Sequence, residues 1–170
     1  MFRPSTGTWF VIRSSDAGTY GVNFGISTDR PVQGDYDGDF KTDIAVYRDG
    51  TWFINRSSTN SVLIANWGTA SDKPVAGDFD GDGRNDLAIY RSGQWWVVNS
   101  LAGTTNVVAL GLGTDVAVPA DYDGDGTSDR AVYRPSTGEW FVLRSSDSML
   151  TGVKWGISTD VPVPSAYLPQ

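Results

Sequence analysis

The sequence contains no cysteine and no histidine, and Glu139 is its single glutamate. Without cysteine there are no disulfide bonds and no thiol nucleophile, although this leaves the cellular compartment open. Without histidine the commonest general base is missing. A carboxylate pair for glycoside hydrolysis would have to come from aspartates. These absences predict a protein that is not an enzyme.

Long apolar runs and basic clusters are missing as well. No stretch approaches the ~20 apolar residues of a membrane span, so we expect no membrane insertion. The first residues, MFRPSTG, lack the apolar core of a signal peptide, so an export signal is expected outside this chain. With a net charge of −7 and an isoelectric point near 4.4, no nucleic-acid partner is expected.

Aromatic residues and turn formers are plentiful. The 170 residues include seven each of Trp, Tyr and Phe and are 39% hydrophobic, which favours a folded protein. Twenty glycines and eight prolines indicate many turns. The length suits a single domain, which we predict over residues 1–170.

The sequence repeats itself four times. Trp9, Trp52 and Trp95 are spaced by 43 residues, and Trp140 follows after 45 because its preceding turn is longer. Each of these tryptophans is followed sixteen residues later by a glycine and four residues after that by an aspartate: Gly25, Gly68, Gly111 and Gly156, then Asp29, Asp72, Asp115 and Asp160. The repeats cover approximately residues 2–48, 49–91, 92–134 and 135–170.

Within a repeat the apolar residues alternate with a period of two, as in β-strands. In TWFINRSS (51–58), Trp52 and Ile54 point to one face while Phe53 and Asn55 point to the other. The further predicted strands are 61–68, 74–79, 86–91, 94–100 and 105–111. Four short antiparallel strands per repeat are typical of a propeller blade. We predict an all-β fold, a β-propeller of four four-stranded blades with almost no helix.

Other arrangements explain the repeat less well. A β-sandwich does not ordinarily repeat every 43 residues, and a calcium-binding solenoid repeats far more tightly. The blades could form a four-bladed ring, part of a larger propeller, or half of a ring built from two chains. A last strand at 162–168 could complete the blade begun by the hairpin at 8–24 and so close the ring.

Three loops carry aspartates at positions 1, 3, 5 and 9: residues 35–43, 78–86 and 121–129. A pair of carboxylates ~5 Å apart repels by about 3 kcal/mol at an effective dielectric constant of ~20. A calcium ion removes this repulsion and accepts 6–8 oxygen ligands. We predict about three structural calcium ions. Their ligands are expected to be Asp35, Asp37, Asp39, Asp43, Asp78, Asp80, Asp82, Asp86, Asp121, Asp123, Asp125 and Asp129, with the backbone carbonyls of Lys41, Arg84 and Thr127.

The alternative is that these loops are solvated turns, but three copies with the distant fourth aspartate argue against it. Filling all three sites with Ca²⁺ would neutralise six of the seven net negative charges. Phe40 stands where the other loops have Gly83 and Gly126. If that position needs a positive φ, Phe40 is strained and the first site is expected to be the weakest.

GDYDGD at 34–39, GDFDGDGRNDLAIYR at 77–91 and ADYDGDGTSDRAVYR at 120–134 resemble the FG-GAP/VCBS repeats. Such repeats form the integrin α-subunit propeller and occur in many bacterial surface and secreted proteins. The resemblance covers nearly the whole chain. It implies calcium in the aspartate loops, between the first two strands of a blade, and an extracellular or cell-surface location. Integrin-type propellers have seven blades, whereas this chain has four repeats.

Together these observations predict a non-enzymatic, calcium-stabilised extracellular binding or adhesion module. Its expected partner is a protein or a glycan at the cell surface, and self-association could complete a larger ring. The alternatives are a calcium-dependent lectin and an accessory propeller domain of a secreted polysaccharide-degrading enzyme. We expect the four repeated tryptophans to pack in the core, and Arg48, Arg91 and Arg134 to pair with aspartates.

Overall fold

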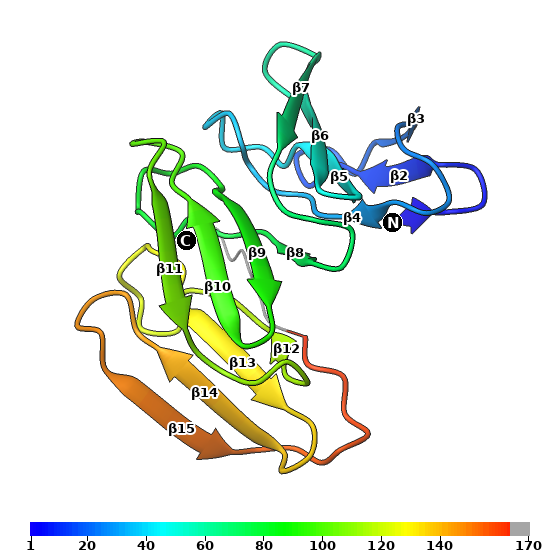
Figure 1. Cartoon of the computed structure of the whole chain (residues 1–170). Coiled ribbons are helices and arrows are strands. Elements are labelled where there is room, and N and C mark those ends of the chain that lie inside the picture. Colours follow the sequence, from blue (N-terminus) through cyan, green and yellow to red (C-terminus); the bar gives the residue numbers. More distant parts are fainter. Residues whose placement is uncertain (164–170) are drawn as a thin grey trace. The chain divides into compact units, whose positions relative to one another are not determined.

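The computed structural model describes residues 1–163, whose regular secondary structure consists of β-strands alone (Figure 1). The chain consists of two compact units, Met1–Ala70 and Ser71–Gln170, which are described one after the other. The predicted single domain over 1–170 stays a prediction. In the described part of the chain no helix is long and apolar enough to cross a membrane.

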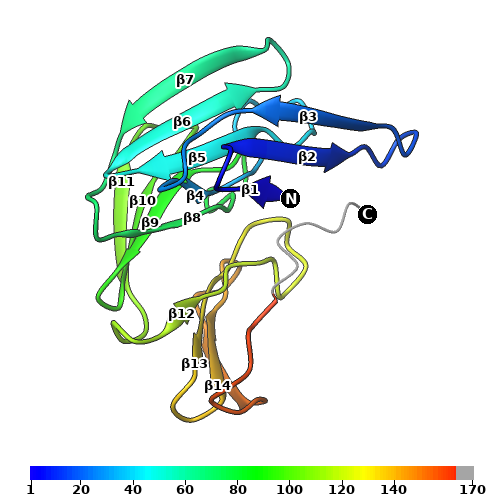
Figure 2. The same cartoon turned by 90° about the vertical axis from the view of Figure 1, so that its right-hand side faces the viewer.

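The first unit contains two antiparallel sheets. One sheet has the order β1 (Phe2–Arg3), β2 (Thr8–Ile12), β3 (Thr19–Asn23). The other has the order β4 (Arg30–Pro31), β5 (Ile44–Arg48), β6 (Thr51–Arg56), β7 (Ser61–Asn66). Figure 2 shows β1 next to the N-terminus, at the edge of its sheet.

The second unit also contains two antiparallel sheets. The first has the order β8 (Lys73–Val75), β9 (Leu87–Arg91), β10 (Gln94–Val98), β11 (Thr105–Ala109). The second has the order β12 (Val116–Ala117), β13 (Arg130–Arg134), β14 (Glu139–Leu143), β15 (Leu150–Lys154). These up-and-down sheets are the blades of a β-propeller fold, which confirms the predicted fold class.

The sheets are out of phase with the repeats defined on the sequence. Each four-stranded sheet begins with a short strand before an acidic loop and ends with the hairpin after it. A block such as 49–91 therefore contributes to two sheets. Within the described residues the first sheet has three strands, without a counterpart of β4. The predicted closing strand at 162–168 falls mostly on residues 164–170, which lie outside the described residues.

Each sheet has a tryptophan at the equivalent position, on β2, β6, β10 and β14, and those on the first three of these strands are buried. Trp52 and Ile54 on β6 are fully buried, as the period-two pattern predicts. Tyr47 on β5 lies opposite Trp52 and contacts it edge-on, with 5.3 Å between the ring centroids. The Trp52 indole Nε1 donates a hydrogen bond to the carbonyl of Trp67 at 2.9 Å. The predicted core role is confirmed for Trp52, and likewise for Trp9 and Trp95.

In the second unit the two sheets share a hydrophobic core. Tyr90, Trp95 and Val97 of the first sheet are buried together with Val132 of the second. Phe141 on β14 packs against this cluster. Stacking of neighbouring sheets therefore buries the apolar faces that single blades would expose. Trp140 is less buried than its three counterparts.

An ion pair recurs next to the first strand of three sheets. The carboxylates of Asp29, Asp72 and Asp115 have no exposed side-chain surface. Each accepts two hydrogen bonds from an arginine at the end of the second strand, at 2.6–3.1 Å: Arg48, Arg91 and Arg134 in turn. The predicted pairing of these arginines with aspartates is confirmed.

Candidate metal centre

The three acidic loops occupy equivalent places in the fold. Residues 35–43 connect β4 to β5, residues 78–86 connect β8 to β9, and residues 121–129 connect β12 to β13. Each loop therefore joins the first two strands of a four-stranded sheet, so both of its ends are held by strand pairing.

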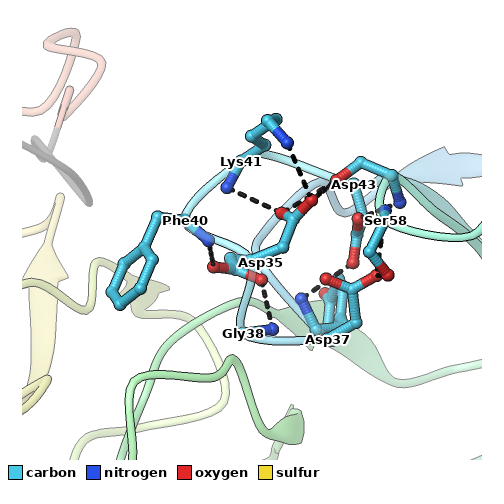
Figure 3. Close-up of polar contacts among 10 residues, drawn as sticks. Asp35, Asp37, Gly38, Phe40, Lys41, Asp43 and Ser58 are labelled. Carbon is cyan, nitrogen blue, oxygen red and sulfur yellow. Dashed lines mark hydrogen bonds and ion pairs between the residues drawn. The ribbon is translucent and has the colours of Figure 1, made fainter.

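The first aspartate of each loop bends the chain around itself. Asp35 accepts hydrogen bonds from the backbone N–H groups of Gly38 and Phe40, both at 2.7 Å (Figure 3). The other loops repeat this pattern, with Asp78 bonded to Gly81 and Gly83, and Asp121 bonded to Gly124 and Gly126. These bonds turn the backbone inward and bring the alternate side chains to one side.

The last aspartate of each loop ties it to the following hairpin. Asp43, Asp86 and Asp129 are completely buried. Asp86 accepts hydrogen bonds from the N–H of Phe79 at 2.8 Å and from the N–H of Ser100 at 2.7 Å. Asp43 and Asp129 make the equivalent bonds, with Tyr36 and Ser57 and with Tyr122 and Ser145. These carboxylates fix the loop whether or not they bind an ion.

Serines after the third strand also bind the loop carboxylates, which the spacing of the aspartates did not predict. Ser58 donates to Asp37 at 2.6 Å, and Ser146 donates to Asp123 at 2.5 Å. Ser57, Ser100 and Ser145 donate to Asp39, Asp82 and Asp125 at 2.8–2.9 Å. The signal was the Ser-Ser pair that follows a strand at 57–58 and again at 145–146.

Three carboxylates converge in each loop. Their oxygen atoms lie within 4.8 Å of one another in three groups: Asp35, Asp37 and Asp39; Asp78, Asp80 and Asp86; Asp121, Asp123 and Asp129. These are nine of the twelve predicted ligands. The other three, Asp43, Asp82 and Asp125, bond to serines and to the backbone. The carbonyls of Lys41, Arg84 and Thr127 stay predicted ligands.

Burial and neighbouring negative charges raise the pKa of two aspartates in the second loop. Burial raises the pKa of Asp86 to about 6, and the charges of Asp80 and Asp78 add to this shift. Burial also raises the pKa of Asp80, with contributions from the Asp82 and Asp78 charges. Two carboxylates 4.8 Å apart repel by about 3 kcal/mol at an effective dielectric constant of ~20. A cation at this place would remove that cost.

The residues present fit a hard cation. Asp37 Oδ1 and Asp123 Oδ1 are buried and accept no hydrogen bond from any described residue. A buried acceptor without a partner costs about 1–3 kcal/mol, more when charged, and a bound cation satisfies it. All the converging side-chain donors are carboxylate oxygens, the ligands that calcium and magnesium prefer.

The second and third loops contact each other directly. The N–H of Ser128 donates to the carbonyl of Asp78 at 2.6 Å, and the Ser128 hydroxyl accepts from the N–H of Asp78 at 3.2 Å. The first aspartate of one loop is therefore fixed by a residue of the next.

Phe40 adopts the backbone conformation that suits glycine. Its φ is +62°, compared with +86° at Gly83 and +88° at Gly126. The ring is 80% exposed and points away from the carboxylates (Figure 3). The left-handed conformation costs a non-glycine residue roughly 1–2 kcal/mol, and no packing of the ring offsets this cost. The expected positive φ is confirmed, and the weaker first site stays a prediction.

Replacing Phe40 by glycine is expected to stabilise the first unit by about 1 kcal/mol, because glycine adopts this conformation without steric cost. Denaturant unfolding measures the change. Phe40→Ala is the control, since it removes the ring but keeps the strain and should leave stability close to the wild type. Equal gains from both variants would mean that the exposed ring, not the backbone, is unfavourable.

Comparison with known protein families and with curated proteins gives no match.

Proposed function

We propose that this protein is a calcium-stabilised, non-enzymatic binding module of the FG-GAP/VCBS type that works at the cell surface or outside the cell. The observation that carries the proposal is the convergence of three carboxylates in each loop. In the first and third loops one buried carboxylate oxygen, Asp37 Oδ1 and Asp123 Oδ1, accepts no hydrogen bond from the described residues.

Calcium suits these loops better than other common metals. Three carboxylates leave several positions for backbone carbonyls and water, which matches the 6–8 oxygen ligands and flexible geometry of calcium. Magnesium demands near-ideal octahedral geometry, and zinc prefers nitrogen and sulfur ligands. Extracellular calcium modules typically bind with dissociation constants of about 10⁻⁴–10⁻³ M, so the proposed location supplies enough of the ion to fill such sites.

The role of the ion is structural. It would hold the loop between the first two strands of a sheet, where the aspartates alone repel each other. The aspartates of the buried ion pairs support the non-enzymatic assignment, because Asp29, Asp72 and Asp115 are covered by arginines. A carboxylate held in that way cannot exchange protons readily with a substrate.

Calorimetry on protein stripped with a chelator tests the proposal. We expect uptake of about three calcium ions and a melting temperature that rises with calcium, because the ion binds only the folded loops. Asp123→Asn is expected to remove one site, since the amide loses the charge that attracts the ion. Asp16→Asn, in an exposed turn outside the loops, is the control. Failure to take up calcium would contradict the proposal.

A glycan ligand is the second candidate. Trp155 is 76% exposed and lies 6.4 Å from Trp140, with 36° between the ring planes. Both rings line an open cavity of about 590 Å³, together with polar residues such as Thr159 and Asp160. Paired aromatic rings beside polar groups suit the apolar face and hydroxyls of a sugar. A glycan array read with calcium and with chelator tests this, and loss of binding in Trp155→Ala is the expected result.

A further inference from the structure

The third acidic loop is followed by an arginine where the other two loops are followed by aliphatic residues. Arg130 is the first residue of β13, as Ile44 is of β5 and Leu87 is of β9. All three side chains are half-buried, and each is followed by three buried residues. An arginine at a position that suits an aliphatic side chain needs an explanation, because a charge is costly to remove from water.

The guanidinium of Arg130 lies against the second loop. Its Cζ atom is 5.2 Å from the centroid of the Phe79 ring, which is the range of a cation–π contact. Phe79 stands between Asp78 and Asp80 and is 8% exposed. The Phe79 N–H donates to Asp86 at 2.8 Å. Arg130 therefore covers the residue that connects the carboxylates of the second loop.

The backbone holds Arg130 in this place. Ser128, two residues earlier, exchanges hydrogen bonds with Asp78 of the second loop. On the other side, β13 pairs with β14, where Arg130 lies opposite Leu143. Successive residues of an extended chain point to opposite sides. Asp129 therefore belongs to the third loop, whereas the next side chain reaches the second.

Arg130 brings a charge that no described carboxylate pairs with. The ion pairs within residues 1–163 do not include it, and its buried Nε donates no hydrogen bond to a described residue. Burial lowers the pKa of Arg130, and the negative charge of Asp86 opposes this shift. A guanidinium still stays protonated at neutral pH. Its field therefore acts on the second loop without neutralising one carboxylate by contact.

We propose that Arg130 sets the calcium affinity of the second loop as a fixed positive charge that weakens binding there. The role assigned to Arg130 rests on the proposed calcium function. A nearby positive charge offsets part of the repulsion among the carboxylates of the empty loop, and it repels the incoming cation. Both effects reduce the free energy gained on binding. Arg130 is not a ligand, because it acts through its charge alone.

Two single-site proteins test this role. Asp37→Asn with Asp123→Asn leaves the second site, and Asp37→Asn with Asp80→Asn leaves the third. In the second-site protein, Arg130→Leu is expected to lower the calcium dissociation constant about tenfold, because the repelling charge is gone. In the third-site protein the same change should alter it by less than about threefold. Calorimetry on chelator-stripped protein measures both constants.

Further variants separate charge from shape in the second-site protein. Arg130→Gln removes the charge but keeps a polar side chain, and it should give the same gain as Arg130→Leu. Arg130→Lys keeps the charge and should stay within about threefold of the arginine form. Arg13→Leu makes the same change of net charge in an exposed turn of the first unit and should have no effect. The rise in melting temperature with calcium should follow the same order.

Failure of this role and failure of the calcium function give different results. If no single-site protein takes up calcium, the calcium function is wrong, and the role of Arg130 falls with it. If both proteins bind calcium, three results would overturn the role of Arg130 alone. These are an unchanged second site in Arg130→Leu, a weakened second site, and an equal gain at both sites.

Discussion

Replacing Trp95 by alanine is expected to lower the free energy of unfolding of the second unit by about 4 kcal/mol, within the range measured for buried tryptophans. Trp95 has no exposed surface and touches Tyr90 and Phe79 edge-on, at 5.4 and 5.9 Å between ring centroids. Its removal leaves a large cavity between tightly paired strands. Chemical denaturation followed by circular dichroism measures the loss.

Phenylalanine at the same place separates packing from hydrogen bonding. The Trp95 indole N–H is buried without a partner among the described residues, whereas that of Trp52 donates to a carbonyl. Trp95→Phe is therefore expected to cost about 1 kcal/mol less than Trp52→Phe. Trp155→Ala, on an exposed ring, should change stability little. A cost for Trp155→Ala equal to that of Trp95→Ala would contradict the burial of Trp95.

Replacing Arg48 by methionine is expected to destabilise the first unit by about 3 kcal/mol, because it leaves the Asp29 carboxylate buried without its counter-ion. The carboxylate has no exposed surface, while a third of the arginine side chain is exposed. This exposure places the expected cost at the low end for broken buried pairs. Arg13→Met breaks an exposed pair and should cost less than about 1 kcal/mol.

The Arg48→Met effect should depend on pH with a defined sign. Burial alone would raise the pKa of Asp29, but the hydrogen bonds from Arg48 and Ile26 lower it below its usual value. The pair therefore stabilises the fold fully above the unfolded pKa of about 3.9. This contribution is lost as the pH falls through the lower folded pKa. In the variant, burial without Arg48 raises the pKa of Asp29 instead, so the stability difference between wild type and variant should be largest near neutral pH and shrink as the pH falls through that raised pKa.

The periodicity of the sequence was enough to predict the blades. Strong alternation at Trp52 and Ile54 located β6, and the 43-residue spacing carried this assignment to β10. It was harder to predict which four strands form one sheet, because nothing in a repeating sequence shows where one structural unit begins. Strands as short as Arg30–Pro31 also carry too little pattern to stand out from a loop.

The position of the acidic loops was predictable, but the arrangement of their carboxylates was not. Spacing alone gave four equivalent aspartates per loop. The third carboxylate of the first group comes from loop position 5, Asp39. In the other two groups it comes from position 9, Asp86 and Asp129. Serines many residues away also bind the loop carboxylates, as Ser57 binds Asp39. Short motifs do not contain such contacts, because they form only when the hairpin after the loop folds back.

The hydrogen bonds between Ser128 and Asp78 couple the second and third acidic loops. A ligand that orders one loop also restricts the backbone of its neighbour, so the neighbour loses less conformational entropy when it binds in turn. Ion binding to both loops would then be positively cooperative without any change of structure. Two adjacent sites coupled in this way would fill over a narrower range of ion concentration than two independent ones.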